Sequence, residues 1–286
     1  MTSILVTGAT GRLGRLAIDA LLARGVDPAS VSALVRDADR GRDLADLGID
    51  VRVGSYDDLG SLDLALKGVE RLLFVSGSEV GRRVEQHGNV VDAAVRAGVG
   101  LVAYTSITRA DTSPLGLAPE HLATERALAA SGLPHVLLRN SWYVENYTGQ
   151  AAQQIEHGVV LGAAGDGRVS AATRADYAEA AAVAVLSDDL AGQVFELGAD
   201  EAFTLGEYAA TLAEVAGAPV AYRDLSVDDY TAALVGAGLP EGYARALAES
   251  DAGLRDGALL VETGDLSRLL GRPTTPLAEA VRSGLR

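Results

Sequence analysis

The chain contains no cysteine, which excludes disulfides, thiolate nucleophiles and thiolate metal ligands. No apolar run approaches the ~18 residues that a membrane-spanning helix needs, so we expect no membrane insertion. Lysine and arginine form no dense cluster, and the formal net charge of −15 opposes binding to nucleic-acid phosphates and anionic lipids. The first predicted strand begins almost at the N-terminus and leaves no room for a signal peptide. We therefore expect a cytoplasmic protein that binds no nucleic acid.

The first half of the sequence alternates short apolar strands with helical segments. Near-continuous apolar strands that alternate with helices predict a parallel sheet covered on both faces. The expected fold class is therefore α/β, a Rossmann-type doubly wound parallel sheet. The predicted strands are Ile4–Thr7, Val31–Val35, Ile49–Val53, Arg71–Val75, Leu101–Thr105 and His135–Leu138, and the predicted helices lie near residues 13–21, 39–47, 59–67, 84–98 and 119–131.

The second half is less regular. Residues 162–167 predict a glycine-rich turn, and Asp176 is expected to cap a helix that runs to about Leu186. Residues 193–197 predict one more strand that returns to the sheet. The expected domains are an NAD(P)-binding Rossmann domain at residues 1–140 and a smaller, mostly C-terminal α/β substrate lobe at residues 141–286, which returns to the Rossmann sheet near residues 173–199.

Three glycines follow the first strand at a spacing typical of dinucleotide-binding loops. Gly8 would make the tight turn, Gly11 would let the backbone approach a pyrophosphate, and Gly14 would let helix and strand pack closely. The N-terminus of the helix would then offer N–H groups to the phosphates. A plain strand-to-helix turn is the alternative, but the position of the loop between a strand and a helix favours a nucleotide site.

The end of the second strand indicates which dinucleotide binds. An acidic residue there would bind the ribose 2′-OH of NAD, whereas an arginine accommodates the 2′-phosphate of NADP. Arg36 occupies this position, Asp37 follows it, and Arg12 and Arg40 could add positive charge. NADPH is therefore favoured, with NADH still allowed. The alternative is that Arg36 is a solvated surface charge.

Six long stretches carry a resemblance to a known family: VTGATGRLG, LLFVSGSEVG, VAYTSITRADTSPLGLAPEH, LLRNSWYVENY, GAAGDGRVSAATRADYA and GRPTTPLAEAV. Together they span nearly the whole chain. They resemble the NmrA-like branch of the atypical short-chain dehydrogenases/reductases and, within it, the type 2 NAD(P)H:quinone oxidoreductases. The resemblance implies an enzyme without flavin or metal that passes hydride from NADPH to a small quinone.

The same resemblance implies cofactor contacts at the carboxyl ends of several strands. In a doubly wound sheet the ligand crevice lies at this edge. The implied cofactor-binding residues are Gly8, Ala9, Thr10, Gly11, Arg12, Leu13, Arg36, Ser76, Gly77, Ser78, Arg139, Asn140, Ser141, Trp142, Tyr143 and Val144.

The chain departs from the usual short-chain dehydrogenase pattern, which places Tyr-x-x-x-Lys on the fifth helix. Ser106 follows the fifth strand as in the family, but the helix carries His121 and Glu125. His121 could donate a proton, the two could form half of a metal site that lacks further ligands, or they could form a surface ion pair at i, i+4. Hydride addition to a quinone yields a phenol-like anion, whose conjugate acid has a pKa near ~10, so this reaction needs no strong acid.

Aromatic residues make up only 5% of the chain, yet three of them follow the sixth strand. A quinone could stack on these rings, with packing between the lobes as the alternative. Arg174 could point toward the same crevice or form an ion pair within the second lobe. The expected substrate-binding residues are Trp142, Tyr143, Tyr147 and Arg174, and the expected catalytic residues are His121 and Tyr143.

A second class of function remains open. The missing Tyr-x-x-x-Lys is also compatible with a non-catalytic, NADP-binding redox sensor of the NmrA-like type, which would report to a protein partner. The chain could also form a homodimer.

Overall fold

The computed structural model describes residues 2–285, and the chain divides into two compact units. Unit 1 comprises Met1–Asp111, Pro119–Asn140 and Arg174–Phe195, and unit 2 comprises Thr112–Ala118, Ser141–Thr173 and Glu196–Arg286. Each unit is discontinuous in sequence, so the chain passes more than once from one to the other.

Unit 1 is built on a sheet with the strand order β3-β2-β1-β4-β5-β6-β9. Neighbouring strands from β3 to β6 pair in parallel, and this order confirms the doubly wound Rossmann-type topology. The strands are β1 (Ile4–Val6), β2 (Val31–Val35), β3 (Asp50–Val53), β4 (Arg71–Phe74), β5 (Leu101–Ile107), β6 (His135–Asn140) and β9 (Val194–Leu197).

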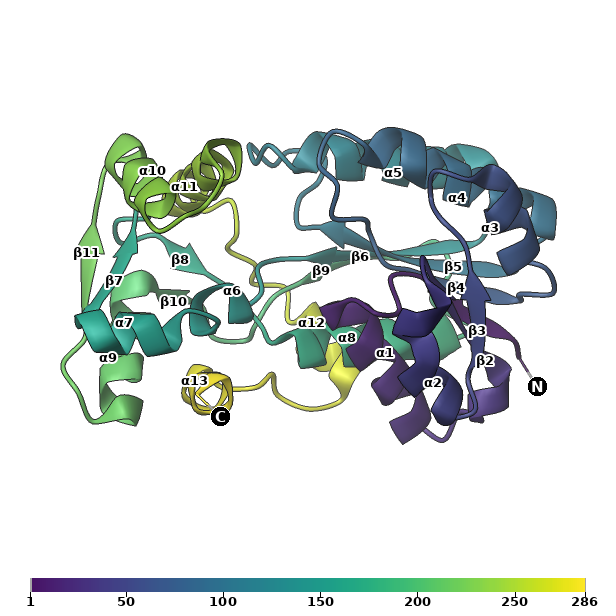
Figure 1. Cartoon of the computed structure of the whole chain (residues 1–286), viewed down its shortest axis with the longest axis horizontal. Helices are drawn as coiled ribbons and strands as arrows, with labels where there is room; N and C mark the ends of the chain where they lie inside the picture. Colours follow the sequence, from purple (N-terminus) through teal and green to yellow (C-terminus); the bar gives the residue numbers. More distant parts are fainter. Residues whose placement is uncertain (1, 286) are drawn as a thin grey trace. The chain divides into compact units, whose positions relative to one another are not determined.

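Helices cover both faces of this sheet. Helix α1 (Arg12–Ala23) packs against α8 (Arg174–Leu186) on one face, and α3 (Leu59–Ala65), α4 (Arg83–Ala97) and α5 (Ala118–Ser131) cover the other (Figure 1). The double cover explains why β2 and β5 are buried along their whole length. Leu5, Phe74 and Tyr104 are fully buried in the core beneath α3, α4 and α5.

The helix predicted near residues 39–47 is divided. A short 3₁₀ turn, η2 (Ala38–Gly41), precedes α2 (Arg42–Asp46), and another, η1 (Pro28–Ser30), precedes β2. The side chain of Asp37 accepts a hydrogen bond from the backbone N–H of Asp39 at 3.0 Å, which starts the tighter turn. The expectation of a single helix was therefore wrong, because the segment begins as a 3₁₀ turn and continues as the short helix α2.

Helix α8 begins earlier than its predicted cap. Asp176 lies in the first turn and is fully buried, so the expectation that it caps the helix was wrong. Strands β5 and β6 also run beyond their predicted ends, because Ile107 pairs with Asn140 in register.

Unit 2 contains two small sheets. Strand β7 (Val159–Gly162) pairs in parallel with β11 (Ala221–Asp224), and β8 (Arg168–Val169) pairs antiparallel with β10 (Phe203–Thr204). The predicted glycine-rich turn joins β7 to β8. The helices are α6 (Glu145–Thr148), α7 (Ala151–His157), α9 (Leu205–Ala216), α10 (Val227–Gly236), α11 (Glu241–Arg255), α12 (Asp265–Leu270) and α13 (Leu277–Gly284).

Within residues 2–285, no helix has both the length and the apolar character required to cross a bilayer.

Candidate functional site

The glycine loop after β1 has a backbone that larger residues rarely adopt. Gly8 has φ +58°, in the left-handed region, and its carbonyl accepts a hydrogen bond from the N–H of Gly11 at 2.8 Å. A Cβ atom at Gly14 would lie 2.2 Å from the Gly8 oxygen, well inside any allowed contact. The loop therefore passes close to the first turn of α1 only because these residues lack side chains.

The N-terminus of α1 is suited to an anion. Among residues 2–285, no side chain caps this helix, and its first turn contains no acidic residue. Arg12, the first residue of the helix, is exposed. Backbone N–H groups at an uncapped helix start, together with the positive end of the helix dipole, attract phosphate.

Arg36 follows β2 and is largely exposed, with 70% of its side-chain surface accessible. Its Nη1 atom donates to Glu79 Oε1 at 3.2 Å. Asp37 is engaged elsewhere, because its carboxylate caps η2. Glu79, rather than Asp37, is therefore the acidic partner of this arginine.

The loop after β4 is held by side chains on both sides. The backbone N–H of Ser76 donates to Thr105 Oγ1, and that of Gly77 donates to His87 Nε2, each at 2.9 Å. The Nε atom of Arg83 donates to the Gly77 carbonyl at 2.6 Å. Ser78 follows as an exposed residue. Three of the implied cofactor contacts thus lie on a loop whose first part is firmly anchored.

His87 is a structural residue of unit 1. It is fully buried and contacts the rings of Phe74 and Tyr104. Burial, and then the charge of Arg83, lowers its pKa to about 3, so the ring is neutral at neutral pH. Nε2 accepts from Gly77, which leaves the proton on Nδ1, 2.8 Å from Thr124 Oγ1.

The structure contradicts the surface ion pair between His121 and Glu125. Both side chains are buried, with exposures of 6% and 5%. His121 Nδ1 lies 2.9 Å from the hydroxyl of Tyr104. Burial, and then the charges of Arg83 and His87, lowers the pKa of His121 to about 3, so a neutral imidazole is present at neutral pH.

Glu125 instead joins a buried cluster with Ser106 and Arg139. Arg139 donates to both of its carboxylate oxygens, from Nε at 2.9 Å and from Nη2 at 2.7 Å. Ser106 donates its hydroxyl to Oε1 at 2.6 Å. Arg139 also pairs with Asp111 at 3.1 Å. The Arg139 guanidinium, an implied cofactor contact, is therefore engaged by Glu125 and Asp111.

Asn140, the last residue of β6, has an unsatisfied buried acceptor. The residue is 4% exposed, and its Oδ1 atom has no hydrogen-bond partner within residues 2–285. A buried amide oxygen without a donor is costly. Its place at the carboxyl end of a parallel strand of the sheet makes it a candidate for contact with a ligand donor.

The segment after β6 belongs to unit 2. The hydroxyl of Ser141 donates to the Leu259 carbonyl at 2.8 Å. Ala172 donates to the Trp142 carbonyl at 3.1 Å and accepts from the N–H of Val144 at 3.0 Å, which places Tyr143 in an isolated parallel bridge with Ala172. The backbone of this implied cofactor segment is thus held in unit 2, while Trp142 and Tyr143 stay half-buried.

Tyr147 packs inside unit 2. Its ring lies 6.1 Å from that of Phe203 and 5.6 Å from that of Tyr208, between centroids. Its buried hydroxyl has no hydrogen-bond partner among residues 2–285. Burial, and then the charge of Asp251, raises its pKa well above 10. Arg174, the fourth predicted substrate contact, begins α8 in unit 1.

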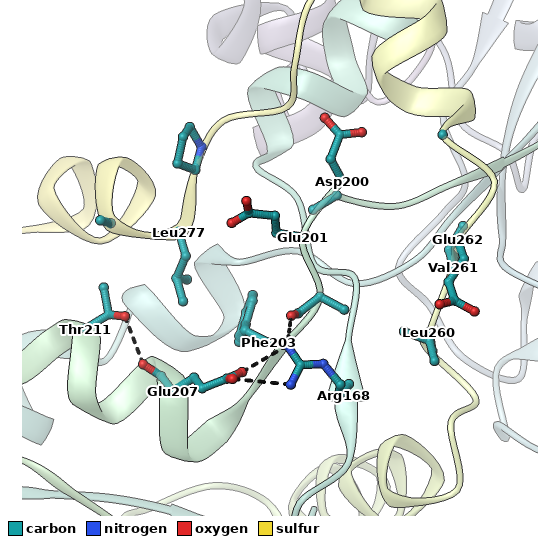
Figure 2. A pocket seen from close by; sticks show the side chains of 15 residues that line it. Arg168, Asp200, Glu201, Phe203, Glu207, Thr211, Leu260, Val261, Glu262 and Leu277 are labelled. Carbon is teal, nitrogen blue, oxygen red and sulfur yellow. Dashed lines mark hydrogen bonds and ion pairs between the residues drawn. The ribbon is translucent and has the colours of Figure 1, made fainter.

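Unit 2 also contains a hollow of about 810 Å³ that involves none of the predicted site residues (Figure 2). Its labelled carboxylates include Asp200, Glu201 and Glu207. Arg168 pairs with Glu207, and Glu207 also completes a capping box with Thr204 at the start of α9. These contacts indicate that Arg168 and Glu207 stabilise the local structure at the start of α9.

The sequence analysis missed several residues near the predicted site. Glu79, which pairs with Arg36, and Gln86, which donates to Glu79, lie 43 and 50 positions beyond Arg36. Tyr104 faces His121 from a strand that reads as continuous core. The stretch SGSEVG did place a carboxylate at the end of β4, which was the one available clue to Glu79.

The sheet order, the glycine loop and the uncapped α1 define a Rossmann-type dinucleotide-binding protein. The sequence profile of the NmrA-like family matches residues 1–258. The chain belongs to the NmrA-like family.

Individual relatives match over almost their full length. Quinone oxidoreductase 2 of Escherichia coli is 50% identical over 278 residues, 97% of each chain. A crystal structure of the NADPH-dependent quinone oxidoreductase of E. coli complexed with NADPH superposes with a TM-score of 0.96 at 49% identity, and covers 99% of this chain and 100% of that one. Triphenylmethane reductase of Citrobacter, complexed with NADP(H), gives 0.94 at 37% identity, with coverages of 99% and 100%.

Proposed function

We propose that this chain is an NADPH-dependent quinone reductase that transfers hydride to a quinone without flavin. The observation that carries the proposal is the 50% identity to the E. coli quinone oxidoreductase across 97% of both chains. That identity extends through both units, so it includes more than the dinucleotide-binding sheet.

The described residues of unit 1 fit a dinucleotide. Gly14 lets the backbone of the glycine loop pack directly against α1, because a Cβ there would clash with Gly8, and α1 begins without a capping side chain. Asn140 offers a buried oxygen that lacks a donor. The loop Gly8–Leu13 would hold the pyrophosphate, Arg36 would contact the 2′-phosphate, and Asn140 would accept from an N–H group of the nicotinamide carboxamide.

When bound, NADPH supplies a hydride from its nicotinamide ring. The residues of this chain then have to orient the acceptor and keep water away, since proximity and alignment provide much of the rate. The product anion of a quinone is delocalised, so a neutral hydrogen-bond donor is sufficient to stabilise its oxygen. Of the two proposed catalytic residues, Tyr143 brings a phenol, and His121 brings a buried, neutral imidazole next to Tyr104.

The proposed quinone contacts are the rings of Trp142 and Tyr143, with Tyr147 and Arg174 as polar contacts. Tyr147 supports this assignment because its hydroxyl is buried without a partner among residues 2–285. Its raised pKa keeps the phenol protonated, so it can donate to a quinone oxygen throughout the neutral pH range. The cytoplasmic location and the homodimer stay predictions from the sequence.

Steady-state oxidation of NADPH tests the proposal. Purified protein whose absorption spectrum shows no flavin should oxidise NADPH in the presence of benzoquinone, naphthoquinone or menadione. NADH should support the reaction less well. No turnover above the uncatalysed rate with any of the three would contradict the proposal.

The redox-sensor alternative gives a different result in the same experiment. A sensor would bind NADP⁺ and NADPH tightly and reduce no acceptor. The near full-length identity to an oxidoreductase favours catalysis.

A further inference from the structure

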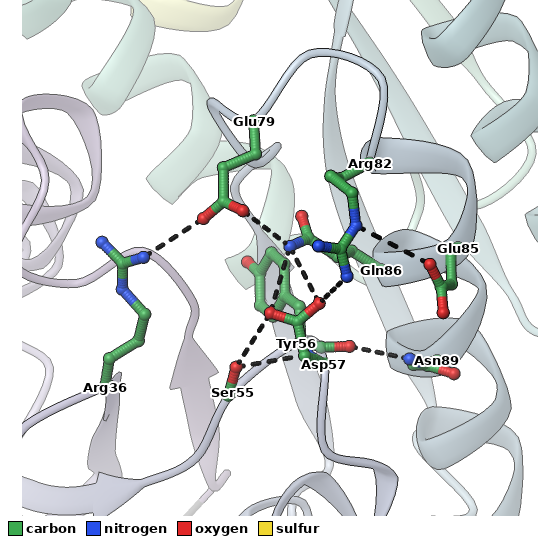
Figure 3. Close-up of polar contacts among 9 residues, drawn as sticks. All are labelled: Arg36, Ser55, Tyr56, Asp57, Glu79, Arg82, Glu85, Gln86 and Asn89. Atoms are coloured by element: carbon green, nitrogen blue, oxygen red, sulfur yellow. Dashed lines mark hydrogen bonds and ion pairs between the residues drawn. The ribbon is translucent and has the colours of Figure 1, made fainter.

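The carboxylate of Glu79 lies between Arg36 and Gln86 (Figure 3). Arg36 Nη1 donates to Oε1 at 3.2 Å, and Gln86 Nε2 donates to Oε2 at 3.1 Å. Each carboxylate oxygen thus has its own donor. Glu79 is therefore oriented from both sides, and one of its oxygens faces the arginine proposed to contact the cofactor.

Gln86 gives this arrangement a rigid base. It lies on α4 and is 3% exposed, and its amide also donates to Asp57 at 3.2 Å. The chain on either side of Glu79 is anchored as well, through Gly77 to His87 and through the N–H of Gly81 to Glu120 at 2.7 Å. A buried amide and two anchored backbone positions thus aim a partly exposed carboxylate at Arg36.

The chemistry of this contact bears on cofactor choice. A 2′-phosphate would need the same guanidinium that Glu79 engages, so the phosphate and the carboxylate would compete for Arg36. A ribose 2′-OH, in contrast, can donate to a carboxylate. We propose that Glu79 is a specificity-determining residue that opposes Arg36 and limits the preference for NADPH over NADH. The inference rests on the proposed function, because that function assigns Arg36 to the 2′-phosphate.

The test is equilibrium binding of NADPH and NADH to the full chain, measured by isothermal titration calorimetry. Glu79→Gln keeps the side-chain length and removes the charge. NADPH should bind about two- to fivefold more tightly, the range of an exposed charge contact, and NADH should bind no more tightly than before. Added salt should shrink the gain, because the contact is exposed.

A matched control separates this effect from a general change in charge. Glu85→Gln removes a carboxylate from the same helix as Gln86. Glu85 is 73% exposed and lies 3.7 Å from Arg82. Both cofactors should keep their wild-type affinities in this variant.

A double variant shows whether Glu79 acts through Arg36. Arg36→Ala alone should weaken NADPH about tenfold or more and leave NADH nearly unchanged. In that background Glu79→Gln should give only a small gain for NADPH. A full gain there would mean that the carboxylate repels the phosphate independently of Arg36, and would overturn the inference.

Other outcomes are equally decisive. Weaker NADPH binding by Glu79→Gln would make Glu79 an orienting partner of Arg36 and overturn the inference, as would equal tightening of both cofactors. Either result, in a wild-type protein that still reduces quinones, leaves the proposed function intact. A wild-type protein that binds neither dinucleotide contradicts both.

Discussion

At the scale of single residues, the buried titratable groups mostly hold backbone in place. His87 accepts from the N–H of Gly77, and Asp251 accepts from the N–H of Ala163 at 3.0 Å. His121 contacts the hydroxyl of Tyr104. Burial keeps both imidazoles neutral at neutral pH. Asp251 is different, because its pKa of about 6 lies close to neutral pH, so its charge changes in the range where the protein can be studied.

Asp251 makes the stability of the fold depend on pH. It is 7% exposed, and burial raises its pKa from 3.8 to about 6. Because the pKa is higher in the folded state, the ionised carboxyl opposes folding; the penalty is complete above about pH 6 and disappears below about pH 4. The difference in unfolding free energy between Asp251→Asn and wild type should therefore grow by about 2–3 kcal/mol, in favour of the variant, as the pH rises from 4 to 7.

Urea denaturation at a series of pH values measures this difference. The exposed Asp256 on the same segment offers the control variant Asp256→Asn, which should track wild type. Parallel pH curves for wild type and Asp251→Asn would show that the carboxyl titrates as it does in the unfolded chain.

The sequence predicted which helix face His121 and Glu125 share, but not their partners. Their i, i+4 spacing indicated a common face, which suggested an ion pair. Tyr104 and Arg139 come from neighbouring strands, and the contacts depend on how α5 packs against the sheet. Pairings that depend on tertiary packing leave no local spacing to detect.

At the scale of elements, a buried ion pair and a hydrogen bond connect α5 to the ends of the neighbouring strands β6 and β5. The carboxylate of Glu125 on α5 accepts hydrogen bonds from Arg139 on β6 and from Ser106 on β5. The side chains of Arg139 and Glu125 are only 11% and 5% exposed. The end of β6, where several predicted cofactor contacts lie, is thus fixed by this cluster.

Glu125→Gln should destabilise the fold strongly. The substitution leaves the buried guanidinium of Arg139 without its bidentate partner. Breaking a buried ion pair in this way lowers the free energy of unfolding by about 3–5 kcal/mol. The midpoint of urea denaturation measures it. The exposed pair Arg96–Asp63 offers a comparison, since Asp63→Asn should change stability by less than about 1 kcal/mol. Equal effects of the two substitutions would contradict a structural role for the buried cluster.

Elements with a long apolar pattern were predictable, and the short ones were not. The strands β1, β2, β4 and β5 are largely buried and read as continuous apolar runs. The predicted bounds of the strands in this sheet agree with the structure to within two residues. The strands β8 and β10 have two residues each. No alternation can be recognised over two residues, so the sheet of β8 and β10 followed only from the structure.

At the scale of the whole molecule, the chain joins a dinucleotide-binding unit to a second α/β unit with its own core. The predicted cofactor loops after β1, β2 and β4 lie in unit 1, and the aromatic segment lies in unit 2. If unit 2 supplies the quinone contacts, substitutions in the two units should affect different kinetic constants.

Trp142→Ala tests this division. Loss of the ring should raise KM for a naphthoquinone about three- to tenfold, the value of one lost aromatic stack, and should change the dissociation constant of NADPH by less than about twofold. Tyr243→Ala, at an exposed position of unit 2, should change neither constant. A loss of NADPH affinity as large as the rise in KM would place Trp142 at the cofactor instead.

Direct hydride transfer from NADPH to a quinone is tested most directly by anaerobic turnover of flavin-free protein. We expect one molecule of NADPH to be oxidised for each molecule of menadione reduced to its hydroquinone, at a rate that added FAD or FMN does not change. NADPH oxidation that begins only after flavin is added, or tight binding of NADPH and NADP⁺ with no oxidation, would contradict the proposed function.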